Sequence, residues 1–365
     1  MDKKFLPENI FKYLSKKVLG QDDVLRKISV AVFKHISGIK SGHIFLIGNS
    51  GTGKTTIMRS IGQFYSEHDT LAKFRVMAIT NANTLIDEEG NVNTFRLFKN
   101  LETNVRNMLG VRITEEKMKE YMENATICID EVDKISSRVS GKVNASGILI
   151  QQSLLTLLEG EAVLYETDVY EDGQQKTLKT SIDTSKLLFI CGGAFEELYE
   201  QVYGLISKHS DERRFKEDAQ MDEKGGIRYI VRFKLKQYVK LSDLFIYGMF
   251  PQFISRFGSI AILDDLSKND LKQIMLHAAD SPFRNSQEYF KAMGIDLRMA
   301  DDALDLIVTH ALENTRIGAR ALREVFSRII ANLEFDPSSS KNLTKSDSNL
   351  ILTIDKETVR ENLTR

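Results

Sequence analysis

Three glycines and a lysine stand close together in a run whose spacing suits phosphate binding. The run Gly48-Asn-Ser-Gly-Thr-Gly-Lys-Thr55 fits the pattern G-x-x-x-x-G-K-[ST], and it lies between an apolar run and a helical pattern. Its glycines allow the backbone to turn so that consecutive N–H groups point at phosphate oxygens. Lys54 would then neutralise the β- and γ-phosphates, and the Thr55 hydroxyl would bind Mg²⁺. We therefore predict a phosphate loop rather than a glycine-rich turn with an accidental lysine.

Two adjacent carboxylates, Asp130 and Glu131, follow the apolar run Thr126-Ile-Cys-Ile129. In an open parallel sheet, ligands bind at the carboxyl ends of the strands. Asp130 would therefore meet the Mg²⁺ held by Thr55, and Glu131 would orient and activate the water that attacks the γ-phosphate. A solvated acidic pair at a strand end is the alternative, and the phosphate loop upstream argues against it. The two motifs together predict a Mg²⁺-dependent ATP hydrolase that binds ATP and ADP.

The elements that must position these residues are short apolar runs that alternate with helical patterns. The apolar runs cover residues 43–47, 74–79, 126–130 and 187–191, and helical periodicity covers residues 22–37 and 55–66. This alternation predicts βα units around a central parallel sheet, and hence an α/β fold. Residues 207–240 are charge-dense with little apolar periodicity, which predicts a solvated surface insertion.

The pattern changes after Leu263, where we expect periodic helices without strands. Two apolar faces recur at helical spacing, the first over residues 303–312 and the second over residues 322–333. A polar loop over residues 336–349 precedes Leu350-Ile-Leu-Thr-Ile354, which we expect to form a terminal strand. We therefore predict a large domain over residues 1–263, with a charged insertion at about 204–240, and a small, mostly helical domain over residues 264–365.

Composition excludes several classes of protein. The 365 residues are 42% hydrophobic and 28% charged, so the chain can bury a core and is not disordered. Lys and Arg total 50 against 51 for Asp and Glu, a balance that argues against bulk electrostatic binding of nucleic acid. We find no apolar run of the roughly 18 residues that a membrane helix needs, and no secretory signal. Cys128 and Cys191 are too few for a disulfide framework. These features predict a cytoplasmic protein that does not bind a membrane.

Beyond these motifs, the sequence resembles the ClpX family of AAA+ unfoldase ATPases over most of residues 14–335, and it is less similar to HslU. The matching segments are Val18-Leu-Gly-Gln21, the phosphate loop, Ile129-Asp-Glu-Val-Asp-Lys-Ile-Ser136, Ile150-Gln-Gln-Ser-Leu-Leu-Thr-Leu-Leu-Glu-Gly160, Asp183-Thr-Ser-Lys-Leu-Leu-Phe-Ile-Cys-Gly-Gly-Ala-Phe195, Phe250-Pro-Gln-Phe-Ile-Ser-Arg256 and Gly318-Ala-Arg-Ala-Leu-Arg323. The resemblance implies an AAA+ P-loop NTPase domain, with its parallel sheet between helices, followed by a helical AAA+ lid.

The resemblance also implies roles for single residues. Arg256 matches the arginine finger, which reaches the γ-phosphate held by a neighbouring subunit, and Arg320 matches the sensor-2 arginine, which acts on its own subunit's nucleotide. A finger supplied by a neighbour implies a homo-hexameric ring. With Glu131, these arginines form the expected catalytic set. The expected nucleotide contacts are Val18, Leu19, Ser50, Gly51, Thr52, Gly53, Lys54, Thr55 and Thr56, with Thr55 and Asp130 at the metal.

Several segments depart from the family pattern. We expect no amino-terminal zinc module, because its paired Cys-x-x-Cys motifs have no match. The pore loop Gly-Tyr-Val-Gly is matched by Gly90-Asn-Val-Asn93, and asparagine cannot supply the apolar contact of tyrosine. The Ile-Gly-Phe loop that docks a ClpP-type protease is matched by Gly226-Ile-Arg-Tyr229, whose arginine disfavours an apolar cleft. The basic pore-entrance loop is replaced by Glu166-Thr-Asp-Val-Tyr-Glu-Asp-Gly-Gln-Gln-Lys176, for which we expect a hairpin around Asp172-Gly173.

These observations leave three functions open. The first is an ATP-driven ring that remodels or unfolds protein substrates. The second is a nucleotide-switched AAA+ scaffold that threads nothing, which the Asn91 departure favours. The third is an AAA+ ATPase acting on nucleic acid, which the balanced charge and the absence of a recognisable DNA-binding motif disfavour.

Overall fold

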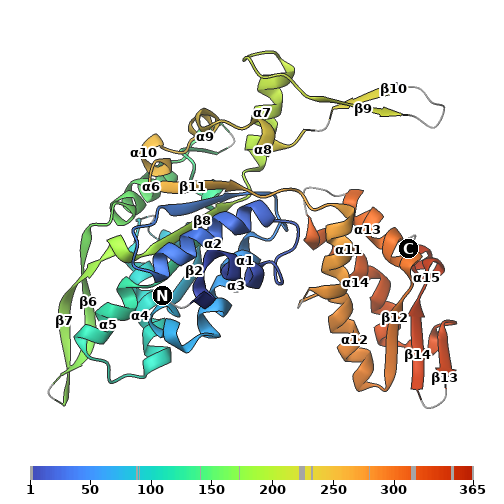
Figure 1. Cartoon of the computed structure of the whole chain (residues 1–365), viewed down its shortest axis with the longest axis horizontal. Helices are drawn as coiled ribbons and strands as arrows, with labels where there is room; N and C mark the ends of the chain where they lie inside the picture. The colour runs from blue at the N-terminus through green and yellow to red at the C-terminus, as the bar shows by residue number, and fades with distance from the viewer. Residues whose placement is uncertain are drawn as a thin grey trace. The chain divides into compact units, whose positions relative to one another are not determined.

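The structure is a computed structural model, and its chain divides into two compact units (Figure 1). It describes residues 3–87, 89, 91–139, 141–171, 173–221, 227–231, 233–278, 280–313, 318–346 and 349–363. Unit 1 comprises Met1–Leu14, Asp23–Gly48 and Ile57–Leu263. Unit 2 comprises Ser15–Asp22, Asn49–Thr56 and Asp264–Arg365. The phosphate loop after Gly48 thus packs with the carboxyl-terminal part of the chain.

Unit 1 is built on a sheet of five strands in the order β11-β1-β8-β3-β2. The strands are β1 (His43–Ile47), β2 (Met77–Asn81), β3 (Thr126–Asp130), β8 (Leu188–Gly193) and β11 (Phe257–Ile262). All four pairings are parallel. Every residue of β1 and β8 is buried, which explains why these strands read as unbroken apolar runs. The predicted α/β fold is confirmed.

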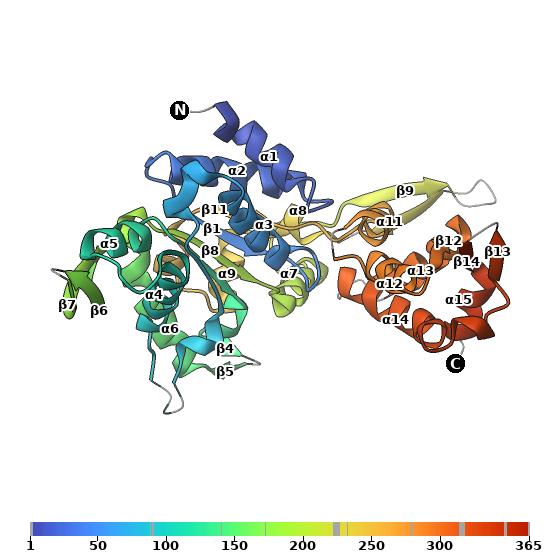
Figure 2. The same ribbon diagram turned by 90° about the horizontal axis from the view of Figure 1, so that it is seen from below.

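Helices cover the sheet of unit 1 (Figure 2). They are α1 (Pro7–Leu14), α2 (Asp22–Ile36), α3 (Lys54–Ser66), α4 (Phe95–Leu109), α5 (Glu115–Glu123), α6 (Ala145–Leu158), α7 (Glu196–Ser207), α8 (Leu235–Tyr238), α9 (Leu241–Tyr247) and α10 (Pro251–Ile254). In α4, for example, the side chains at positions 97, 98, 101 and 105 recur at helical spacing and are buried in the core. Among the described residues, we find no helix that combines the length and apolar character needed to cross a bilayer.

In the part of unit 1 that the structure describes, three hairpins extend from it. The longest pairs β6 (Ala162–Glu171) with β7 (Gln174–Asp183), as expected from the turn signal, although Asp172 lies outside the described residues. The charged insertion holds β9 (Glu217–Met221) and β10 (Ile227–Val231), which project beyond α7 and α8 in Figure 1. The third hairpin is short and pairs β4 (Arg138–Val139) with β5 (Lys142–Val143).

Unit 2 contains helices and a small sheet. The helices are α11 (Lys268–His277), α12 (Pro282–Ala292), α13 (Asp301–Glu313), α14 (Ala319–Phe335) and α15 (Lys356–Leu363). The apolar faces predicted on α13 and α14 are buried in its core. The sheet has the order β12-β14-β13, with β12 (Ile295–Met299), β13 (Leu343–Ser346) and β14 (Asn349–Ile354). The terminal strand is therefore confirmed, with a further helix after it.

Three expectations about secondary structure are wrong. The helical region after Leu263 does contain strands, because β12 alternates buried Ile295 and Leu297 with outward polar residues over only five positions. β13 falls in the predicted polar loop, since an edge strand that pairs only with β14 needs no apolar run. The strand expected at residues 74–79 begins instead at Met77, because Phe74 ends a 3₁₀ segment and is buried there.

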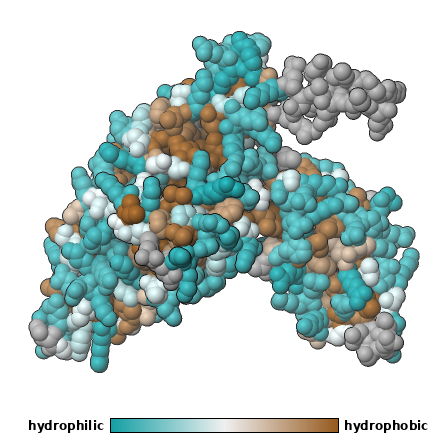
Figure 3. Space-filling model, viewed as in Figure 1, coloured by the Kyte–Doolittle hydropathy of each residue, from teal (hydrophilic) through white to brown (hydrophobic). Residues whose placement is uncertain are grey.

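The surface of unit 1 carries an apolar patch on α9. Leu241, Phe245 and Ile246 are 55%, 39% and 61% exposed, and the brown area over α9 in Figure 3 marks this face. Leu241 and Phe245 are four residues apart and lie on the same side of the helix, with Ile246 beside Phe245 in the chain.

Candidate active site

The carboxyl ends of three neighbouring strands meet at one edge of the sheet in unit 1. β8 lies between β1 and β3, and both pairings are parallel. β1 runs into Gly48, whose N–H donates to the carbonyl of Gly193 at the end of β8, at 3.2 Å. β3 ends at Asp130. The start of the phosphate loop and the acidic pair therefore lie at the edge where parallel sheets bind ligands.

The phosphate loop has the turned backbone that its glycines allow. Gly51 and Gly53 have φ of 75° and 108°, in the left-handed region that favours glycine. Helix α3 begins at Lys54, so its positive end faces the loop. The Lys54 side chain is buried, and its ammonium donates to the Asn49 carbonyl at 3.0 Å. The loop thus holds a buried cation at a helix start, an arrangement suited to anionic phosphates.

The other predicted loop residues differ in exposure. Thr52 is buried, and its hydroxyl donates to the Asn49 carbonyl at 2.8 Å. Thr55 is half-buried, whereas Thr56 is exposed. Thr55, which follows Lys54 in the first turn of α3, is the hydroxyl that the motif assigns to the metal.

The acidic pair has a strained backbone. Glu131 has φ 59° and ψ 34°, a left-handed conformation that costs a residue with a side chain about 1 kcal/mol or more. Its N–H donates to the Asp130 carboxylate at 2.9 Å, which orients that carboxylate. Asp130 is half-buried and Glu131 is exposed. Strain of this kind concentrates at functional sites, and here it turns two successive carboxylates out of the strand end.

A buried aspartate ties the ends of β3 and β8 together. Asp133 is 4% exposed and accepts the N–H of Ala194 at 3.2 Å. A Cβ atom at Gly193 would lie 2.6 Å from the Asp133 carboxylate, so only glycine allows this approach. Sequence reasoning assigned no role to Asp133, although it stands two residues after the acidic pair.

Within unit 2, two segments distant in sequence pack against the phosphate loop. Val18 is buried, and a Cβ atom at Gly53 would meet its Cγ1 at 3.5 Å. The N–H of Ala319, at the start of α14, donates to the Gly51 carbonyl at 3.2 Å. Arg320 follows in the first turn of α14 and is exposed. The expected adenine segment and the expected sensor-2 helix therefore both lie at the loop, and Leu19 is half-buried beside Val18.

Arg256 follows α10 and forms an ion pair with Glu159, which caps α6 in the same chain. The two side chains are 42% and 31% exposed, so the pair is partly solvated. Glu159 belongs to a motif that the sequence analysis quoted, yet it received no role there. Nothing in the spacing signalled this pairing, because the two residues are far apart in the chain.

The segment that matches the pore loop is held by its own backbone. The N–H of Asn93 donates to the Leu85 carbonyl at 2.7 Å, and the N–H of Asp87 donates to the Asn91 carbonyl at 2.9 Å. Ile86 forms an antiparallel β-bridge with Val92. Gly90 lies outside the described residues. Val92 is half-buried and packs against the core. Asn91 is exposed. Tyr121, in α5, packs against the core.

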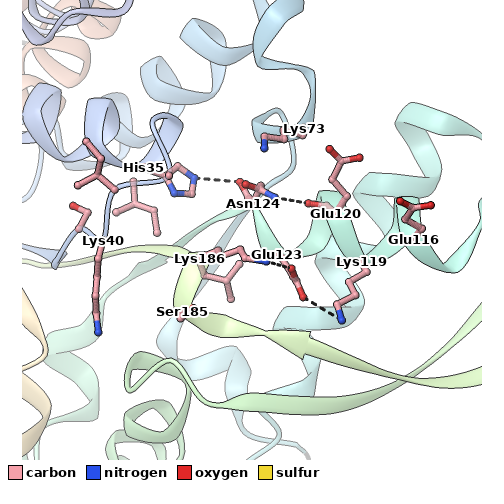
Figure 4. Close-up of a pocket in the computed structure, with 15 residues that line it drawn as sticks. His35, Lys40, Lys73, Glu116, Lys119, Glu120, Glu123, Asn124, Ser185 and Lys186 are labelled. Atoms are coloured by element: carbon pink, nitrogen blue, oxygen red, sulfur yellow. Dashed lines mark hydrogen bonds and ion pairs between the residues drawn. The ribbon is translucent and has the colours of Figure 1, made fainter. Parts of the chain in front are cut away.

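A cavity of about 650 Å³ lies at the opposite edge of the sheet in unit 1 (Figure 4). Its walls come from the chain just before β1, β3 and β8. Buried Glu123 accepts from Lys186 at 2.6 Å and lies 3.8 Å from Lys119, and His35 contacts the Asn124 carbonyl at 3.1 Å. These contacts connect α2, α5 with its C-cap Asn124, and the 3₁₀ segment Thr184–Lys186 that precedes β8.

Comparisons with known proteins agree with this site. Residues 39–260, more than half of the chain, match the family model described as AAA domain (Cdc48 subfamily). The chain is 31% identical over 360 residues to the ATP-dependent Clp protease ATP-binding subunit ClpX of Borrelia duttonii, which covers 93% of this chain and 76% of that protein. It is 28% identical over 353 residues to the protein of the same name from Bacteroides thetaiotaomicron, with 92% and 78% covered. For Treponema denticola the identity is 30%, with 92% and 78% covered. The chain therefore belongs to the ClpX family of AAA+ ATPases, which bind and hydrolyse ATP.

Proposed function

We propose that this chain forms a homo-hexameric ring that hydrolyses ATP to remodel or unfold protein substrates. The observation that carries the proposal is the position of Gly48, where the phosphate loop starts, and of a strained acidic pair at one sheet edge of a ClpX-family chain. In this proposal residues 1–263 are the large ATPase domain and residues 264–365 are the lid. The proposed location is the cytoplasm.

The residue types of the phosphate loop and the acidic pair suit ATP with Mg²⁺. The buried ammonium of Lys54 and the turned glycines suit the phosphates, and Val18 with Leu19 offers apolar contact for the base. The Thr55 hydroxyl and the Asp130 carboxylate are oxygen donors of the kind that Mg²⁺ prefers. When bound, the metal would neutralise charge on the β- and γ-phosphates. The remaining proposed contacts are Ser50, Gly51, Thr52, Gly53 and Thr56.

Each proposed catalytic side chain would act on a different part of the reaction. The exposed carboxylate of Glu131 would accept a proton from the attacking water and orient it. Arg256 would leave Glu159 and neutralise charge on the γ-phosphate of a neighbouring subunit. Arg320, beside the phosphate loop, would act on the nucleotide of its own chain.

The proposed substrates are weakly held assemblies and unstructured protein segments. Asn91 presents an amide where the family has tyrosine, and Val92 packs inward. Docking of a ClpP-type protease is not part of the proposal, because arginine stands at position 228. The matching Gly226 and the side chains of β10 lie outside what the structure describes. Nucleic acid and zinc are not part of the proposal.

The test compares stimulation of ATP hydrolysis by an unfolded protein and by DNA. We expect stimulation by the unfolded protein and none by DNA. Passage of a fluorescently labelled unfolded chain through the ring, measured separately, distinguishes a remodelling ring from a scaffold that only switches with nucleotide. ATP hydrolysis without threading would support the scaffold.

A further inference from the structure

We infer that Gln151, a buried residue of α6, is a positioning residue for Arg256. It ties the start of α10 to the 3₁₀ turn Val132–Ile135, which follows the acidic pair, and this attachment sets where the arginine stands. All of these residues belong to unit 1. Figure 1 shows α10 beside α6, and the two helices are in contact. The inference rests on the proposed function, because it takes Arg256 as the residue that acts on a neighbour's nucleotide.

The side-chain amide of Gln151 bonds three backbone groups that come from two segments. Gln151 is fully buried. Its Nε2 donates to the carbonyls of Ile135 at 2.7 Å and Gly248 at 3.2 Å. Its Oε1 accepts the N–H of Phe250, the N-cap of α10, at 2.8 Å. Both N–H groups and the oxygen of the amide are therefore bonded, and a buried polar group that is satisfied in this way specifies one arrangement of its partners.

The turn to which Gln151 attaches α10 is itself held by α6. Asn144, the N-cap of α6, donates through its Nδ2 to the carbonyls of Lys134 and Ser136, each at 3.0 Å. Gln151 bonds the carbonyl between these two, and it stands about two helical turns after Asn144. Two amides on one side of α6 thus hold three successive carbonyls, so the turn is a fixed base for α10.

Backbone hydrogen bonds connect Phe250 to Arg256 without a break. The N–H of Ile254 donates to the Phe250 carbonyl at 3.0 Å, and the N–H of Arg256 donates to the Phe253 carbonyl at 3.2 Å. Pro251 is the first residue of α10, and its ring fixes the φ angle there. Because α10 is only 4 residues long, a shift of Phe250 would also shift Arg256.

The two attachments of the arginine segment differ in how they respond to movement of the guanidinium. The ion pair of Arg256 with Glu159 is partly solvated and has to break when the arginine reaches a phosphate. The bonds of Gln151 are buried and remain in place when it breaks. They therefore set the position from which the guanidinium acts, and a displacement of about 1 Å from the productive geometry can cost on the order of 10²-fold in rate.

Gln151→Met tests the inference, because methionine has a similar length and lacks the amide. We expect kcat for ATP hydrolysis to fall about tenfold or more. The dissociation constant for a non-hydrolysable ATP analogue should stay within about twofold of wild type, since the phosphate loop is unchanged and the arginine serves another subunit.

Mixed rings distinguish positioning of Arg256 from a general loss of stability. Lys54→Ala subunits keep a correctly placed Arg256, which can serve the intact nucleotide site of a Gln151→Met neighbour. The rate per Gln151→Met subunit should therefore rise about threefold or more on mixing, relative to rings of Gln151→Met alone. A residue that supported only its own chain's acidic pair or the stability of the fold would give no such recovery.

Gln201→Met is the matched control. Gln201 is half-buried in α7, and its Nε2 donates to the Asp243 carbonyl of α9 at 2.9 Å, so the substitution removes a bond within unit 1 that does not reach α10. Its rate of ATP hydrolysis should stay within about twofold of wild type. If Gln151→Met does not fold, Gln151→Ala replaces it, because water can enter the polar space that alanine leaves. For this variant we expect kcat to fall about threefold or more, with the same recovery in mixed rings.

The mixed rings also separate this inference from the proposed function. If Lys54→Ala subunits restore hydrolysis to Arg256→Ala but not to the Gln151 variant, the inference is overturned and the proposed function stands. A wild-type rate in a folded Gln151 variant, or a clear loss of its affinity for the analogue, would also overturn the inference. If Arg256→Ala itself hydrolyses ATP at the wild-type rate, the proposed role of the arginine fails, and the inference that rests on it fails too.

Discussion

The Asp87 carboxylate accepts the backbone N–H of Asn91 at 2.7 Å, and the Asp87 N–H donates in return to the Asn91 carbonyl at 2.9 Å. The hydrogen bond from Asn91 holds the pKa of Asp87 below its usual range. This exchange closes the turn that corresponds to the ClpX pore loop. The turn therefore presents an amide at its exposed position, and the neighbouring Val92 packs inward.

Asn91→Tyr should strengthen the grip on a protein substrate. A tyrosine ring restores apolar area worth on the order of 1–2 kcal/mol per contact, and several subunits would grip at once. We expect faster unfolding of a stable tagged domain with little change in basal ATP hydrolysis. Asn91→Gln, which adds length without a ring, is the control. Brisk unfolding of that domain by the wild-type protein would show that other residues grip, and the short β4–β5 hairpin would then be examined first.

Arg256→Ala should bind ATP normally and hydrolyse it poorly, because the finger would act on a neighbour's nucleotide. Lys54→Ala should instead weaken ATP binding, since it removes the cation of the phosphate loop. Mixed rings of the two variants should recover part of the wild-type rate of ATP hydrolysis, measured against each variant alone. Absence of recovery in subunits shown to co-assemble would argue that Arg256 does not act across an interface.

Acidification from pH 7 to pH 5 should destabilise unit 1 through two buried histidines. Burial lowers the pKa of His35 and of His43 to about 4. In the unfolded chain both titrate near 6.5, so the unfolded state binds more protons than the folded state over this interval. The free energy of unfolding therefore decreases as the pH is lowered. The loss should be about 2 kcal/mol per histidine at pH 5.

The proton positions of His43 make it the better residue for this test. Its Nδ1 accepts the N–H of Phe189 at 3.3 Å, so its Nε2 carries the proton and donates to the Leu158 carbonyl at 3.2 Å. His43→Gln cannot take up a proton in this range. Its thermal midpoint should therefore fall less between pH 7 and pH 5 than that of the wild type, and an equal fall would contradict the assignment.

Glu102→Ala should loosen the β6–β7 hairpin. The Glu102 carboxylate accepts from the hydroxyls of Tyr165 and Thr167, each at 2.7 Å, and from Arg106 at 3.0 Å. Its removal deprives the hydroxyls of buried Tyr165 and Thr167 of this acceptor, at a cost of about 1–3 kcal/mol. We expect faster amide exchange along β6 and β7. Glu166→Ala, on the exposed face of β6, should leave that exchange unchanged.

The three inner strands of the sheet could be predicted because they are buried along almost their whole length. β1, β3 and β8 each contain an apolar run of at least three residues, and β1 and β3 lead directly into the phosphate loop and the acidic pair. β11 escaped prediction because Gly258 interrupts it, and that glycine is needed where the chain passes Gly42: a Cβ atom at Gly258 would lie 2.8 Å from the Gly42 Cα. The hydrophobic pattern of neighbouring residues does not indicate a glycine that is required by a segment far away in the chain.

Part of the candidate site could likewise be predicted from the sequence, and part of it could not. The phosphate loop and acidic pair are contiguous motifs, so their residue types and spacing predict their chemistry. The pairing of Arg256 with Glu159, and the bonds of Gln21 to Asp264, join residues far apart in the chain. Such contacts depend on packing of whole elements, and the sequence carries no local signal for them.

The most direct test of this account is the rate of ATP hydrolysis and the affinity for ATP, measured together in Glu131→Gln. Glutamine keeps the size of the side chain but cannot accept the proton of the attacking water, so we expect hydrolysis to fall by about 10²–10⁴-fold. Lys54, Thr55 and Asp130 are unchanged, so the dissociation constant for ATP should stay within about twofold of wild type. Hydrolysis at the wild-type rate by Glu131→Gln would contradict the assignment of the acidic pair, and with it the site proposed here.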